Sequence, residues 1–85
     1  MKEYHIDFDT VHDSAGFHQL LQQTLELPEW YGCNLDALYD CLTELPQPVR
    51  LVLHRWDEDV PFALGFRDVF LDATAEDPDF SVEFA

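Results

Sequence analysis

Three short segments of this chain alternate apolar and polar side chains, and this alternation is the feature that most constrains its fold. The segments cover residues 2–8, 49–54 and 80–84. Such alternation is typical of a strand with one buried face. Pro46 and Pro48 separate the second segment from the residues before it. We therefore expect three half-buried strands.

Two segments between the first and second strands have helical spacing instead. Ser14 is the candidate N-cap of a helix whose leucines recur at helical intervals, and Pro28 stops this helix. Asn34 is a favourable N-cap for a second helix that reaches about Thr43. The sequence thus predicts two helices in succession before the chain returns to the sheet.

The residues between the last two strands predict a short helix or turn at 60–64 and a helix near 66–75, which Asp-Pro-Asp at 77–79 ends. The order strand, helix, helix, strand, helix, strand is typical of an α/β fold with right-handed crossovers and a three-stranded parallel sheet. Because each strand has a single strongly apolar face, we expect two layers, with the helices packed mainly on one face of the sheet.

A chain of 85 residues has room for one hydrophobic core, so we expect residues 1–85 to form a single domain. Cys33 and Cys41 cannot provide a disulfide framework, and free thiols suit a reducing compartment. The first residues are too polar for a signal peptide, and no stretch approaches the roughly 20 apolar residues of a membrane span. These features predict a soluble cytoplasmic protein that does not bind a membrane.

The charge of the chain is strongly unbalanced, since 18 acidic residues against four Lys and Arg give a formal net charge of −14. This charge argues against direct binding of nucleic acid or of an anionic membrane surface. Acidity can simply aid solubility. Self-repulsion at this density nevertheless lowers the stability of a small domain. The composition therefore favours a search for a basic partner.

The predicted second helix has one apolar and one polar face. At about 100° per residue, Asp36, Tyr39, Asp40 and Thr43 share one side, whereas the leucines and Cys41 occupy the other. No Lys or Arg lies three or four positions from either carboxylate, and like charges four residues apart repel. Two interpretations stay open: a solvated acidic face, or carboxylates that await the cations of a partner.

Trp30 and Tyr31 directly precede this helix, in a loop turned by Gly32. Large aromatic side chains are costly to expose, and Trp and Tyr are favoured anchors of protein interfaces. We expect one of the two to pack beneath the loop. The pair supports the interpretation that the polar helix face meets a partner.

The string LPEWYGCNLDALYDCLT at residues 27–43 resembles the barstar family of intracellular ribonuclease inhibitors. A weaker similarity extends across the chain and includes LVL at residues 51–53. The resemblance implies a parallel three-stranded sheet with packed helices, in agreement with the pattern above. It also implies that the chain is no enzyme, and that its loop and second helix plug the active site of a basic, barnase-type ribonuclease.

The resemblance also implies roles for individual residues. Asp40 matches the acid that enters the phosphate site of the nuclease, and Asp36 matches a second acid that meets its basic residues. Trp30 and Tyr39 match interface aromatics, and Thr43 matches an interface hydroxyl. A nuclease cleft holds phosphate with cationic side chains, so a fixed carboxylate can take the place of an RNA phosphate. The predicted partner-binding residues are Trp30, Tyr31, Asn34, Asp36, Tyr39, Asp40, Thr43, Glu44 and Asp72.

The chain departs from the family pattern at several of these positions. Asp72 stands where the family has a longer Glu, Glu44-Leu45 replaces the usual Gly-Trp, and Cys33 replaces an acid in the loop. The departures leave the identity of the nuclease open. The resemblance is compatible with a barnase-like enzyme, and also with a toxin nuclease against which the chain acts as an immunity protein.

Other kinds of site find less support in the sequence. The four histidines are scattered over different predicted elements with no pair at a metal-ligand spacing, so we expect no metal and no cofactor. Asp36 and Asp40 would suit the acid–base pair of a small hydrolase, but neither a nucleophile motif nor a Gly-rich phosphate loop accompanies them. An interaction module for another basic protein is a further alternative.

Overall fold

The computed structural model of the chain describes residues 2–45 and 48–85, so Pro46, expected to precede the second strand, lies outside the described residues. The described residues form, in order, β1 (Lys2–Asp7), the 3₁₀ helix η1 (Phe8–Thr10), α1 (Ser14–Leu25), α2 (Leu35–Glu44), β2 (Val49–His54), α3 (Ala63–Glu76) and β3 (Phe80–Phe84). This order confirms the α/β fold with a parallel sheet that the periodicity predicts.

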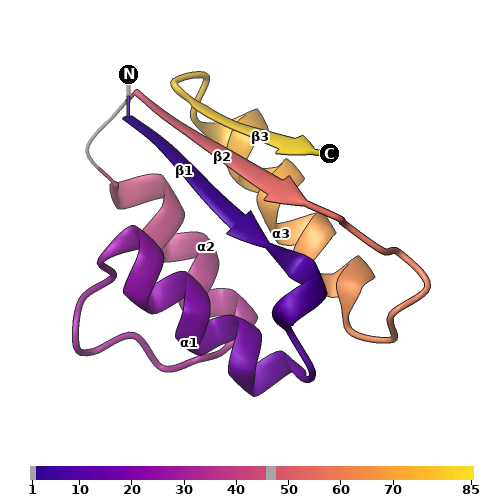
Figure 1. Cartoon of the computed structure of the whole chain (residues 1–85). Helices are drawn as coiled ribbons and strands as arrows, with labels where there is room; N and C mark the ends of the chain where they lie inside the picture. The colour runs from indigo at the N-terminus through magenta and orange to yellow at the C-terminus, as the bar shows by residue number, and fades with distance from the viewer. Residues whose placement is uncertain (1, 46–47) are drawn as a thin grey trace.

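The sheet has the strand order β1-β2-β3, and both neighbouring pairs are parallel. The register pairs Ile6 with Leu53 and Leu53 with Phe84, so the apolar residues of the strands line up on one face. Figure 1 shows the helices on that side of the sheet and none on the other. The chain therefore has two layers, with one face of the sheet left open.

The core lies between the sheet and the helices. Val49, Leu51 and Leu53 of β2 are almost completely buried, as the two-residue period predicts. Phe17 of α1 meets Phe66 of α3 with ring centroids 4.5 Å apart. Burial of apolar side chains is the dominant favourable term in folding, so this contact holds α1 and α3 on the sheet.

Three local details differ from the sequence-based expectations. Asp13, not Ser14, is the N-cap of α1, because its carboxylate accepts a hydrogen bond from the backbone N–H of Gly16 at 2.6 Å. A negative charge at this position also interacts favourably with the helix dipole. The strand expected to reach residue 8 ends at Asp7, whose carboxylate accepts a hydrogen bond from the N–H of Asp9 and turns the chain into η1.

The third detail concerns α3, which begins at Ala63 and therefore takes in the end of the segment expected as a separate helix or turn at 60–64. Gly65 lies inside this helix although glycine weakens helices. A Cβ atom built on Gly65 would lie 3.2 Å from Leu35 Cδ1. Gly65 therefore allows the close approach of α2 to α3.

Among the described residues no helix is long and apolar enough to cross a membrane.

Candidate functional site: an acidic groove between two helices

The start of α2 is fixed by Asn34, as the sequence predicts. Its side-chain oxygen accepts a hydrogen bond from the N–H of Ala37 at 2.8 Å, and its own backbone is extended. Asp36 therefore lies in the first turn of α2, where the helix dipole favours a carboxylate.

The orientation of α2 follows from its apolar side. Leu38, Cys41 and Leu42 are buried against the rest of the core. Because these residues lie on the side opposite to the acids, Asp36 and Asp40 are exposed. The carboxylates are thus held on a helix whose other face is anchored by packing.

A groove between α2 and α3 gathers four of the predicted partner-binding residues. It is lined by Leu35, Asp36, Tyr39, Asp40, Val69 and Asp72, and it has a volume of about 390 Å³. We call the hollow lined by these six residues the acidic groove. Its walls carry carboxylates from both helices, whereas Leu35 and Val69 supply apolar surface. Such a surface suits the aliphatic stem and the charged end of a basic side chain.

The carboxylates of the groove have no cationic partner among residues 2–45 and 48–85. The ion pairs of these residues join Arg50, Arg55 and Arg67 to acids elsewhere, and the imidazole of His5 contacts Glu3. None involves Asp36, Asp40 or Asp72. Unneutralised acids that lie together on a rigid scaffold repel one another, and a cationic partner would relieve this repulsion.

The negative charge of the groove affects the pKa of Tyr39. Desolvation, followed by the carboxylates of Glu76, Asp72 and Asp40, raises the pKa of its phenol above the ordinary value. The phenol thus stays neutral and able to donate a hydrogen bond at neutral pH. Glu76 was not predicted from the sequence, although its position four residues after Asp72 on α3 was a usable signal.

The two loop aromatics have opposite environments. Trp30 is 61% exposed, whereas Tyr31 is 5% exposed and belongs to the core. The hydroxyl of Tyr31 forms a hydrogen bond with Nδ1 of the buried His18 on α1. One of the two aromatics, Tyr31, therefore packs beneath the loop, as expected, whereas the side chain of Trp30 is exposed to solvent.

Burial also sets the protonation of this contact. Desolvation lowers the pKa of His18. Desolvation, and to a smaller extent Cys33 and Cys41, raises the pKa of Tyr31. Both side chains are consequently neutral at pH 7, which suits a buried hydrogen bond between uncharged groups.

Thr43 and Glu44 lie at the far end of α2, outside the groove lining. The Thr43 hydroxyl donates within its own helix, to the carbonyls of Tyr39 and Asp40. Glu44 is exposed. Cys33 is an exposed free thiol, and Cys41 is a buried one.

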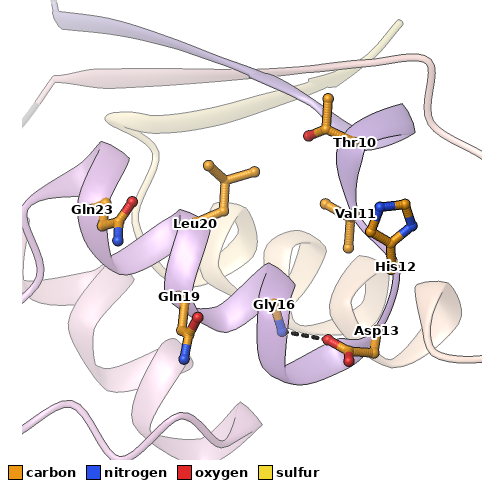
Figure 2. Close-up of a pocket in the computed structure, with 8 residues that line it drawn as sticks. All are labelled: Thr10, Val11, His12, Asp13, Gly16, Gln19, Leu20 and Gln23. Atoms are coloured by element: carbon orange, nitrogen blue, oxygen red, sulfur yellow. Dashed lines mark hydrogen bonds between the residues drawn. The ribbon is translucent and has the colours of Figure 1, made fainter.

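Two other hollows lack converging carboxylates. Figure 2 shows one between η1 and α1, lined by Gln19, Gln23 and others, where the carboxylate of Asp13 is turned to the N–H of Gly16. Another lies near the first residues of α2 and α3 and is largely apolar, with Phe62 and Phe66 in its lining. Neither offers the charge density of the acidic groove.

Comparison with known proteins places these features in a family. The family model described as "Barstar (barnase inhibitor)" matches residues 1–84. The Bacillus subtilis (strain 168) protein named "Putative ribonuclease inhibitor YrdF" is 35% identical over 77 residues. This similarity covers 89% of the present chain and 85% of the Bacillus protein.

Proposed function

This chain belongs to the barstar family of barnase inhibitors, and from that premise we propose that it inhibits a basic ribonuclease by placing its acidic groove in the active site of the enzyme. The observation that carries the proposal is the convergence of Asp36, Asp40 and Asp72, without cationic partners among the described residues, around one groove.

The chemistry of a ribonuclease explains why this groove would suit it. Such an enzyme binds the phosphates of RNA with Arg, Lys and His side chains. Carboxylates fixed on α2 and α3 offer oxygen acceptors to the same cations, but no bond that the enzyme can cleave. In this proposal Asp40 occupies the phosphate site, while Asp36 and Asp72 meet neighbouring cations.

The remaining predicted contacts surround this centre. In this proposal Trp30 covers the rim of the cleft from the loop, and the phenol O–H of Tyr39, which lines the groove, donates a hydrogen bond to the enzyme. Thr43 and Glu44 make contacts at the end of α2, whereas Asn34 and Tyr31 hold the helix start and the loop in place. The cognate enzyme is either a nuclease of the producing cell or a delivered toxin nuclease, and in either case inhibition takes place in the cytoplasm.

A quantitative test is inhibition of a purified barnase-type ribonuclease by the Asp40→Asn variant. Leaving buried cations of the enzyme without their carboxylate costs about 3 kcal/mol, or roughly a hundredfold in the inhibition constant. The matched control is Glu83→Gln, which removes the same charge from the sheet, where Glu83 pairs with Arg50 at 3.0 Å. The control is expected to inhibit like wild type.

The rate of association between the chain and the ribonuclease is an independent test of the same surface. We expect it to fall steeply as salt is added, because charge steering is screened. An Asp40→Asn protein that inhibits as well as wild type would overturn the proposed role of the groove. Inhibition of no ribonuclease, together with binding of a different basic protein, would favour the interaction-module alternative.

A further inference from the structure

The open face of the sheet carries a cluster of polar side chains that the inhibitor role does not use. In the parallel register, His5 lies opposite Val52, and Asp7 lies opposite His54. His5 and His54 are therefore diagonal neighbours on the same face of the sheet, opposite to the face of the buried residues Ile6 and Leu53. Both residues are exposed.

The two imidazole rings are in direct contact. Nδ1 of His5 lies 2.7 Å from Nε2 of His54, and the two ring planes are inclined by only 17°, with centroids 5.0 Å apart. On its other side, Nε2 of His5 lies 2.7 Å from the carboxylate oxygen Oε1 of Glu3. Because a carboxylate can only accept, Nε2 of His5 carries a proton. In the neutral ring, the lone pair of Nδ1 therefore points toward His54.

A carboxylate that accepts a hydrogen bond from one ring nitrogen, and so leaves the other nitrogen with its lone pair, is the arrangement found around histidines that bind metals. We propose that His5 Nδ1 and His54 Nε2 together bind one divalent transition-metal ion, such as Zn²⁺ or Ni²⁺. A zinc ion lies about 2.0–2.1 Å from each imidazole nitrogen, so tetrahedral ligands are about 3.4 Å apart. A small rotation of the two exposed side chains opens the present 2.7 Å separation to this value.

Binding exchanges the hydrogen bond between the rings for two metal bonds. The proton of His54 Nε2 leaves, Nδ1 of His54 keeps or takes up one proton, and the pair donates two lone pairs to the ion. Glu3 stays in place and balances part of the added positive charge. Imidazole ligands favour Zn²⁺, Ni²⁺ and Cu²⁺ over Mg²⁺ and Ca²⁺, which prefer oxygen.

The neighbouring charges leave this pair accessible. Arg50 is engaged by Glu83 at 3.0 Å and lies 3.8 Å from the second carboxylate oxygen of Glu3, and Arg55 is engaged by Asp7 at 2.8 Å. Among residues 2–45 and 48–85, no group of three or more His, Cys, Asp or Glu side chains is placed to hold an ion. The remaining coordination positions are therefore taken by water, and the site has the affinity of a two-histidine chelate.

The position of the pair gives the ion a structural effect. His5 belongs to β1 and His54 to β2, and 49 positions separate them in the chain. An ion that binds the folded chain and not the unfolded one stabilises the folded state, and this stabilisation grows with the logarithm of the ion concentration once that exceeds the dissociation constant. This site lies on the opposite face from the acidic groove, so it does not depend on the proposed inhibition.

The test is calorimetric titration of Zn²⁺ and Ni²⁺ into the purified protein, with Mg²⁺ for comparison. A Cys33→Ser background removes the exposed thiol as a competing ligand. We expect one ion per chain and a rise in melting temperature with Ni²⁺. Both are expected to be lost in His5→Gln and in His54→Gln, and Glu3→Ala is expected to weaken binding about tenfold.

The matched control is His12→Gln, which alters an exposed histidine outside the sheet and is expected to bind like the background protein. Circular dichroism establishes that each variant is folded. Each of the two single His variants tests the proposed site separately. Stoichiometric binding that survives in both His5→Gln and His54→Gln would overturn the proposal. Equal, weak heats for Ni²⁺ and Mg²⁺ would overturn it as well.

Discussion

Asp40→Asn is expected to stabilise the free protein although it removes the central carboxylate of the acidic groove. Within α2, Asp36 lies four residues before Asp40 and Glu44 lies four residues after it. Each like-charge pair at this spacing destabilises a helix by about 0.2–0.5 kcal/mol. Asn and Asp have similar helix propensities. Relief of both repulsions therefore raises the free energy of unfolding by about 0.4–1 kcal/mol, before any gain from Asp72 across the groove.

Scanning calorimetry measures this change directly. For a domain of this size, 1 kcal/mol shifts the melting temperature by about 4–8 °C. The expected rise is therefore about 2–8 °C in low salt. It is expected to shrink at about 0.5 M NaCl, because salt screens exposed charges. Glu83→Gln makes the same change in net charge but breaks the ion pair with Arg50, so this variant is expected to gain nothing.

Two results would refute the reasoning. A wild-type melting temperature for Asp40→Asn in low salt would mean that the groove carboxylates do not repel one another. An equal rise in Glu83→Gln would mean that the net charge of the chain, not the local arrangement on α2, sets the effect. A rise confined to Asp40→Asn, alongside weaker inhibition, is the expected pattern.

Two further predictions concern the buried contact beneath the loop. Tyr31→Phe is expected to lower the free energy of unfolding by about 1–3 kcal/mol, measured in urea, because His18 loses its buried hydrogen-bond partner. Burial lowers the pKa of His18 below 6.5, so below this pH the unfolded chain binds a proton that the folded chain does not. Stability is therefore expected to fall as the pH drops below about 6.5, with a slope of up to about 1.4 kcal/mol per pH unit. In His18→Gln this contribution to the pH dependence is expected to be absent.

Local periodicity was sufficient to predict the sheet and most helix boundaries. The strand period of two places Val49, Leu51 and Leu53 of β2 on one buried face, although Val52 on the other face is buried as well. The start of α3 at Ala63 was missed, because Gly65 weakens the helical signal just where the helix begins. The reason for Gly65, its closeness to Leu35, exists only in the packed structure.

The candidate site was likewise predictable from local sequence only in part. Asp36, Tyr39 and Asp40 could be grouped from the sequence because the helical period alone places them on one face. Asp72 was predicted as a site residue only through the family resemblance, and Glu76 was not predicted at all. The contribution of α3 depends on how α2 and α3 pack, which no local pattern encodes. The contact between His5 and His54 likewise depends on the register of two strands.

The repulsion within the groove has a consequence for binding. Asp36, Asp40 and Asp72 are kept together by the packing of α2 and α3, not by attraction among themselves. A cationic partner therefore gains from each new ion pair and also from the removal of repulsion between the carboxylates. Because the second gain grows with the number of acids held together, the effects of replacing two of them should not be additive. A double variant with Asp36→Asn and Asp40→Asn is thus expected to lose less affinity than the sum of the single losses.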